Sequence, residues 1–147
     1  MNELLRELNR LLDIRQLPFW KRRMVNRRIG KLLARMPTAI DKCHEPYIGP
    51  DGYITLYRGT RLAEYALLMM GKYDSMGVWW SNTSKYASLY ATGQERITPG
   101  LSCVLFVEIP AKYIKISSLA GPDGIQVLFS PAQALPHARR MGRIERQ

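Results

Sequence analysis

Three short segments of the chain carry residue types suited to binding a phosphate-bearing ligand. The first ends in Arg58-Gly59. A guanidinium holds phosphate oxygens through five fixed N–H donors, and a glycine lets a ligand approach the backbone because it has no Cβ. The second contains Trp79-Trp80-Ser81, which offers a flat aromatic surface and a hydroxyl, and the third contains Gln126, whose amide both donates and accepts hydrogen bonds. The pattern predicts a polar binding site.

Each of these residues also has a purely structural interpretation. Arg58 fits a surface arginine in a turn, and Ser81 and Thr83 fit helix caps. One of the two neighbouring tryptophans belongs in the core, because consecutive strand residues point to opposite faces. Tyr86 and Tyr90 are four residues apart on one helical face, which is typical of packing. The order of the segments along the chain therefore carries more weight than any one of them.

Strands and helices predicted after residue 52 would position these segments. Residues 53–57 are β-branched and aromatic, and we expect this strand to stop at Arg58-Gly59. Thr60 is expected to cap a helix that ends at Gly71. Residues 78–81 predict a short buried strand, followed by a helix that Thr83 or Ser84 caps and by a polar loop over 91–100.

The remaining elements predict an α+β fold. Residues 103–109 give the clearest strand signal, and 113–116 and 125–129 predict two more strands around the turn at 121–124. The tail from His137 is expected to be frayed. Residues 3–14 and 19–36 predict two helices separated at Pro18, and Pro50-Asp51-Gly52 predicts a turn. We expect a basic helical extension and connection over 1–52 and a mixed β core over 53–147, forming one compact unit.

The ordered segments resemble the signature segments of ADP-ribosyltransferases. They are Leu56-Tyr57-Arg58-Gly59-Thr60, then residues 77–84 with Tyr86-Ala87 and Tyr90, and then Gln126-Val127-Leu128-Phe129. In that family the first strand ends in Arg or His followed by Gly, the second carries Ser-Thr-Ser or Tyr, and a late strand carries Glu before an apolar run. The resemblance covers about residues 53–131.

The resemblance implies a mono-ADP-ribosyltransferase that uses NAD as its substrate and modifies a protein or a nucleic acid. It assigns Arg58, Ser81 and Gln126 to the catalytic positions. The NAD-binding positions that it implies are Arg58, Gly59, Thr60, Trp79, Ser81, Thr83 and Tyr90.

Gln126 departs from the family pattern, because it stands where the catalytic glutamate is usual. Cleavage of NAD passes through an oxocarbenium-like state that a carboxylate stabilises, and losing such a partner costs about 2.7–4 kcal/mol. An active enzyme needs a substitute carboxylate, for which Glu108 is the first candidate and Glu64 the second. Other chemistry dispenses with the glutamate, as in the related NAD-dependent RNA 2′-phosphotransferases. The alternatives are a catalytically inactive member of the fold that binds an acidic partner, and a nucleic-acid-binding module whose resemblance is accidental.

The segment from Arg15 to Arg35 is strongly basic and contains neither Asp nor Glu. Such a run predicts attraction to phosphates or to an acidic protein surface, with a solvated cationic face as the alternative. The residues expected to bind this acidic macromolecule are Lys21, Arg22, Arg23, Arg27, Arg28 and Lys31.

Composition narrows the class of protein. The chain has 147 residues, a formal net charge of +10 and 46% hydrophobic residues, which favours one globular domain over a disordered or fibrous chain. Cys43 and Cys103 show neither zinc-site nor disulfide spacing, and no metal ligand set is predicted. The N-terminus lacks the uninterrupted apolar stretch of a signal or anchor, so we expect a cytoplasmic protein.

Overall fold

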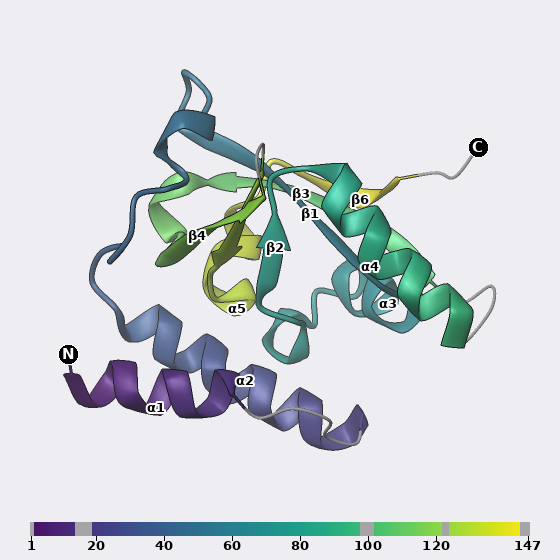
Figure 1. The fold of residues 1–147 in the computed structure, drawn as a ribbon, viewed down its shortest axis with the longest axis horizontal. Helices are drawn as coiled ribbons and strands as arrows, with labels where there is room; N and C mark the ends of the chain where they lie inside the picture. Colours follow the sequence, from purple (N-terminus) through teal and green to yellow (C-terminus); the bar gives the residue numbers. More distant parts are fainter. Residues whose placement is uncertain (1, 14–18, 98–101, 122–123, 145–147) are drawn as a thin grey trace.

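The computed structural model describes residues 2–13, 19–97, 102–121 and 124–144. In this part of the chain the centre is an antiparallel sheet of six strands in the order β4-β5-β2-β1-β3-β6 (Figure 1). The strands are β1 (Tyr53–Arg61), β2 (Trp79–Ser81), β3 (Ser102–Pro110), β4 (Ile116–Gly121), β5 (Gly124–Leu128) and β6 (Arg140–Ile144). The helices are α1 (Asn2–Leu12), α2 (Phe19–Arg35), α3 (Leu62–Met69), α4 (Ser84–Ile97) and α5 (Pro131–Ala134). The predicted α+β class is confirmed.

The sheet consists of two halves that meet between β1 and β2. In the described residues β1 and β3 pair from Tyr53↔Pro110 to Arg61↔Ser102, whereas β1 and β2 pair at Tyr57↔Ser81 alone. On its other side β2 pairs with β5 along its whole length. The two halves therefore separate on either side of one residue pair, which leaves room for a cavity in the middle of the sheet.

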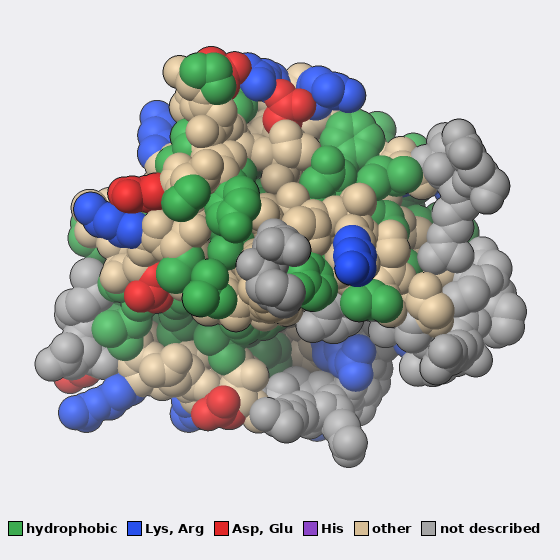
Figure 2. All heavy atoms as spheres, turned by 45° about the horizontal axis from the view of Figure 1, so that its top comes forward, with side chains coloured by type: hydrophobic (Ala, Val, Ile, Leu, Met, Phe, Trp, Pro, Cys, Tyr) green, Lys and Arg blue, Asp and Glu red, His purple; other side chains and the backbone are tan. Residues whose placement is uncertain are grey.

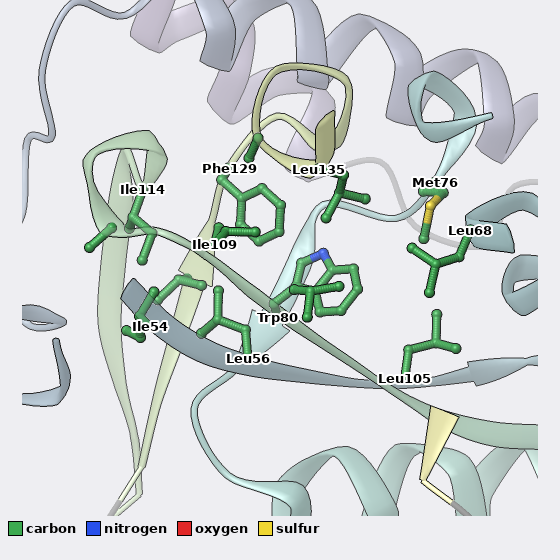
Figure 3. Close-up of a cluster of buried hydrophobic side chains, with 14 of the residues drawn as sticks. Ile54, Leu56, Leu68, Met76, Trp80, Leu105, Ile109, Ile114, Phe129 and Leu135 are labelled. Atoms are coloured by element: carbon green, nitrogen blue, oxygen red, sulfur yellow. The ribbon is translucent and has the colours of Figure 1, made fainter. Parts of the chain in front are cut away.

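One face of the sheet carries the main core. Leu56, Trp80 and Leu105 are buried there, and the rings of Trp80 and Phe129 lie 5.6 Å apart between their centroids. Figure 3 shows these side chains converging with Leu135 on the inner side of the sheet. Burying side chains of this size stabilises the fold by about 1.5–3 kcal/mol each. The core holds β1 and β2 in place although they share so few backbone contacts.

The opposite face is more open and is covered in part by α4. This helix contacts β1 and β3 so closely that a Cβ on Gly59 would overlap the carbonyl oxygen of Ala87. The glycine is therefore needed for helix packing rather than only for ligand approach. Figure 2 shows a surface that mixes hydrophobic and polar side chains, with Lys and Arg at several separate places rather than in one cluster.

The two N-terminal helices build a second cluster against the end of β5. Leu8 from α1 and Ile29 and Leu33 from α2 are buried with Val78 and Leu128. The helix α2 also contacts α5 and the short 3₁₀ helix η2 (Tyr73–Ser75). The basic segment is thus held against the residues that lead into β2 (Figure 1). None of the helices in the described ranges is long and apolar enough to cross a bilayer.

Two predictions around the first motif are wrong. The strand β1 does not stop at Arg58-Gly59 but continues to Arg61, because β3 pairs with it along the whole length. Thr60 does not cap α3, since Arg61 occupies the cap position and makes no side-chain cap bond. The hydroxyl of Thr60 instead donates to Glu64.

Three further predictions differ from the structure in the C-terminal half. The segment 91–97 was expected in a loop but belongs to α4. The strand expected over 113–116 is not formed as predicted, because Tyr113 ends a 3₁₀ helix (Ala111–Tyr113) and β4 begins only at Ile116. The tail after His137 is not frayed in its described part, because β6 adds a strand to the edge of β3. The turn at Gly52 is confirmed by its φ of 86°. Pro18, Pro122 and Asp123 lie outside the described residues.

Candidate functional site

A cavity of about 340 Å³ lies at the junction of β1 and β2. Residues from all three predicted segments line it, including Arg58, Ser81 and Gln126. Gly59, Thr60 and Trp79 also line the cavity, so the structure brings together most of the residues expected at one site. Other contributors are Tyr57, Glu64 and the first turns of α2.

Tyr57, Ser81 and Gln126 form a row across three adjacent strands. Tyr57 is the register partner of Ser81, and Ser81 is the register partner of Gln126. Directly opposed residues of antiparallel strands present their side chains on the same face, with Cβ atoms about 4.5–5.5 Å apart. The hydroxyl of Ser81 therefore stands between a tyrosine and a carboxamide at the wall of the cavity.

Arg58 leaves β1 on the opposite face and is held by Glu64. Its Nε donates to Glu64 Oε1 at 2.6 Å, its Nη2 to Oε2 at 3.3 Å, and its Nη1 to the carbonyl oxygen of Trp79 at 2.9 Å. These contacts use three of the five guanidinium N–H donors. The guanidinium thus bridges the two halves of the sheet in a fixed orientation.

Glu64 is the organising acceptor of this group. Besides Arg58, it accepts a hydrogen bond from Thr60 Oγ1 at 2.6 Å and from the backbone N–H of Gly77 at 3.0 Å. A Cβ at residue 77 would overlap the guanidinium of Arg58, so a larger residue here would have to displace that side chain from Glu64. Four donors converge on one carboxylate, which fixes the loop before β2 relative to β1.

The positive charge of Arg58, together with the hydrogen bonds to the carboxylate, keeps Glu64 ionised. Burial acts to raise the pKa of Glu64, but the positive charge of Arg58 and the bonds from Arg58, Thr60 and Gly77 outweigh it, so the pKa lies below its ordinary value. The side chains of Glu64 and Arg58 are 14% and 21% exposed. The charged pair therefore persists at neutral pH in a setting partly removed from water.

In the second predicted segment some residues line the cavity and others stabilise the fold. Trp80 is buried in the core, whereas Trp79 is 40% exposed and lines the cavity, so the two tryptophans do face opposite sides. Ser81 Oγ accepts from the N–H of Thr83 at 3.2 Å, and Thr83 Oγ1 accepts from the N–H of Tyr86 at 3.4 Å. Thr83 is therefore the cap of α4.

Two expected ligand residues are not placed at the cavity. Thr83 is not among the residues that line it. The side chain of Tyr90 lies outside the described part of the structure. The ring of Tyr86 occupies the space beside Gly121 and Gly124, where a Cβ would overlap it, which agrees with a packing role.

Glu108, the first candidate for a substitute carboxylate, is elsewhere. It lies on β3 opposite Thr55 and pairs with Arg139 and Arg140. Its exposed fraction is 8%, so it is buried within its ion pairs with these arginines. Glu64, the second candidate, is the carboxylate that lines the cavity.

The basic helix α2 contributes directly to the cavity through Arg22, Arg23 and Asn26. Asn26, Ile29 and Leu33 follow one another at helical spacing, and the last two are buried in the second cluster. The inward stripe of α2 is therefore apolar where it meets the sheet and polar where it meets the cavity. A polar stretch on an otherwise buried stripe indicates a surface that meets a ligand or water.

Other cations of α2 are engaged by acids from elsewhere in the chain. Arg27 pairs with Asp74 at 3.1 Å and Arg28 with Glu7 at 2.9 Å. The segment thus has no acid of its own, yet tertiary structure offsets part of its charge. Lys21 and Lys31 are exposed on the same helix.

The cavity has a positive electrostatic character. Among the described residues its lining includes Arg22, Arg23, Arg58 and Arg61, and Glu64 as the one carboxylate, which gives a formal balance of +3. A partly enclosed site of this charge favours an anionic ligand. No group of three or more potential metal ligands occurs among these residues, and Cys43 and Cys103 are free thiols.

The sequence signals for Glu64 and Gly77 are weak. A helical glutamate six residues after an arginine is usually solvent-exposed, and a glycine before a short strand usually marks a turn. Only the pairing of β1 with β2 brings both to Arg58. Comparisons of the chain with protein-family models, with curated proteins and with solved structures find no match.

Proposed function

We propose that the protein binds NAD in the cavity between β1 and β2 and acts as an ADP-ribosyltransferase-like protein of low intrinsic activity. The observation that carries the proposal is the convergence of Arg58, Ser81 and Gln126, from three separate segments, on one cavity with a positive lining. This convergence is what the sequence resemblance requires of a shared site. The α+β fold alone would not support NAD binding, since one fold hosts many functions.

The cavity offers what a dinucleotide needs. Two N–H groups of Arg58 are left over by its contacts to Glu64 and Trp79 and suit a phosphate oxygen. The exposed ring of Trp79 suits the flat face of nicotinamide or adenine. Its volume of about 340 Å³ lies at the lower end of the range of small-molecule sites, about 300–1,000 Å³.

Transfer would break the bond between the nicotinamide nitrogen and C1′ of its ribose. Nicotinamide leaves with the bonding electron pair, which neutralises its ring charge. An acceptor nucleophile forms the new bond to C1′ and releases one proton. Gln126 can hydrogen-bond the ribose hydroxyls but brings no negative charge to the cationic transition state, so we expect slow turnover.

Glu64 does not replace the missing charge in this arrangement. Its two oxygens are occupied by Arg58, Thr60 and the N–H of Gly77. Its negative charge is therefore directed at the guanidinium rather than at a ribose. We assign Glu64 the role of a positioning residue that holds Arg58 for phosphate binding.

A second candidate function is binding of an acidic partner without any transfer. The neutral Gln126 at the cavity wall and the occupied Glu64 favour it, because together they leave the described lining without a carboxylate for catalysis. In this alternative α2 supplies the binding surface. The predicted cytoplasmic location suits both candidates and remains an expectation.

The test compares nicotinamide release from NAD by the wild-type protein and by Gln126→Glu. The substitution restores a carboxylate at the ribose, and we expect a gain of about a hundredfold to a thousandfold. The control is Ser118→Glu, which adds the same charge to the exposed register partner of Gln126 on β4, outside the cavity lining. An equal gain in both variants, or none in Gln126→Glu, would contradict the proposed ribose position of residue 126.

A further inference from the structure

We propose that the macromolecular partner of this site is a single-stranded nucleic acid, bound across the mouth of the cavity between α2 and a groove lined with tyrosines. Its binding stands on the surface itself, whereas its role as the acceptor of ADP-ribose rests on the proposed function. Two independent features on neighbouring parts of the surface carry the proposal.

The first feature is the polar end of α2. Arg22 and Arg23 line the cavity together with Asn26, next to the guanidinium of Arg58. A guanidinium binds phosphate oxygens through paired N–H donors, and cations placed along a helix can follow a backbone of repeated charges. A strand held by these arginines would have a phosphate at the entrance to the cavity.

The second feature is a groove that continues from the cavity along the open face of the sheet. The groove shares Tyr57 with the cavity and is also lined by Tyr47, Tyr53, Asn82 and Arg139. Asn82 directly follows Ser81, so the groove begins beside the row of Tyr57, Ser81 and Gln126. The two depressions are therefore adjacent through shared and consecutive residues.

The side chains of the groove suit nucleobases. The guanidinium carbon of Arg139 lies 4.2 Å from the centre of the Tyr53 ring, and Tyr47 is 42% exposed. Tyrosine rings and arginine planes are the usual stacking surfaces for unpaired bases, and each stacked base contributes to affinity without dictating sequence. An unpaired strand can reach these rings, whereas a stacked duplex keeps its bases inside.

An acidic protein explains less of this surface. Carboxylates would satisfy the arginines of α2 but would leave the groove of Tyr47, Tyr53 and Tyr57 without a flat partner. The formal net charge of +10 attracts either class of partner and does not decide between them. The combination of guanidinium groups on one side and aromatic rings on the other favours nucleic acid.

The first arm of the test measures fluorescence anisotropy of a labelled twelve-nucleotide oligouridine RNA with the full-length protein over a range of salt concentrations. We expect the affinity to fall with salt, and the double variant Arg22→Gln/Arg23→Gln to lower the log–log slope by about 1.4, or 0.7 for each lost phosphate contact. The matched control is Arg10→Gln, which removes an exposed arginine of α1 that is paired with Glu7 and lines neither the cavity nor the groove. An unchanged slope in the double variant, or an equal change in the control, overturns the proposal.

The second arm tests the groove and the class of partner. Tyr53→Ala should weaken RNA binding about tenfold through lost stacking, whereas Tyr113→Ala, whose ring stacks on His137 outside this groove, should leave it unchanged. Polyglutamate of equal charge should compete at least tenfold less well than the RNA. Equal competition would show an acidic-protein surface and overturn the proposal.

Calorimetry with NAD separates this inference from the proposed function. RNA binding with the expected variant effects but without NAD binding would support the nucleic-acid surface and overturn the NAD site. NAD binding without RNA binding would support the NAD site and overturn the nucleic-acid surface.

Discussion

Two glutamates of this protein, the partly buried Glu64 and the buried Glu108, each pair with arginine but lie in different surroundings. Glu64 binds Arg58, Thr60 and the backbone of Gly77 at the cavity between β1 and β2. Glu108 binds Arg139 and Arg140 at the side of β3, away from that cavity. Arg58 is 21% exposed, whereas Arg139 and Arg140 are 44% and 68% exposed.

The difference shows what turns an ion pair into part of a candidate site. Arg58 is anchored by a carboxylate and by the carbonyl oxygen of Trp79 across the sheet junction, and it opens onto a cavity. The arginines of Glu108 come from the C-terminal segment and fasten it to the edge of the sheet, with Arg139 also contacting Asp51. The first pair holds the proposed phosphate-binding group in position. The second joins two pieces of chain, and its Arg139 also lines the neighbouring groove.

The largest effect on stability is expected for Glu64→Ala. The substitution leaves the guanidinium of Arg58 without its counter-charge, and breaking a pair that is partly removed from water costs about 3 kcal/mol in the free energy of unfolding. Urea unfolding measures this loss. A loss below about 1 kcal/mol would mean that water already screens the pair. Glu64 would then contribute no more to stability than Glu108.

A smaller effect is expected for Gly77→Ala, at about 2 kcal/mol. The new Cβ overlaps the guanidinium of Arg58, which must move away from Glu64. The same substitution at Gly30 on α2 makes only ordinary contacts, 3.6 Å from Ser130 Oγ, and should stabilise the helix slightly. Thermal unfolding of both variants provides the comparison, and equal behaviour would contradict the close fit at Gly77.

Glu108→Ala should cost about 1 kcal/mol, because Arg139 keeps Asp51 as a partner and Arg140 is already exposed to solvent. NAD affinity should not change, since Glu108 does not line the cavity. Urea unfolding and a titration with NAD measure the two quantities. A loss of NAD affinity in Glu108→Ala would connect the second pair to the site.

The smallest effect concerns pH. Because the folded-state pKa of Glu64 lies below its unfolded value, its ionisation stabilises the fold above the unfolded pKa, and this contribution is lost as pH falls through the folded pKa. Glu64→Gln should be less stable than the wild type at neutral pH, with the gap narrowing in acid. Unfolding curves at a series of pH values test this, and a constant gap would argue against the lowered pKa.

Sequence patterns predicted those elements whose local signal agrees with their tertiary environment. The residues of β3 and β5 are mostly apolar, and both strands form within about one residue of the predicted ranges 103–109 and 125–129 and are largely buried. The Thr83 cap and the glycine turn at Gly52 follow from local chemistry and were also predicted. These features depend on the residues themselves rather than on distant partners.

The features that sequence could not supply depend on contacts between distant segments. The extension of β1 beyond Gly59 depends on pairing with β3, and the strand β6 exists because the edge of β3 accepts it. The role of Glu64 depends on the meeting of β1 with the loop before β2, and the cavity-facing position of Arg22 depends on how α2 docks. The hydrophobic periodicity of a segment describes that segment alone and does not predict its contacts with distant segments.

The most direct test of the account is a calorimetric titration of the protein with NAD. We predict saturable one-to-one binding by the wild type, at least tenfold weaker binding by Arg58→Lys, which keeps the charge but loses the planar fork, and unchanged binding by Arg28→Lys. The absence of saturable heat with the wild type, or equal affinity of Arg58→Lys, would contradict a cavity in which Glu64 holds Arg58 ready for the phosphates of NAD.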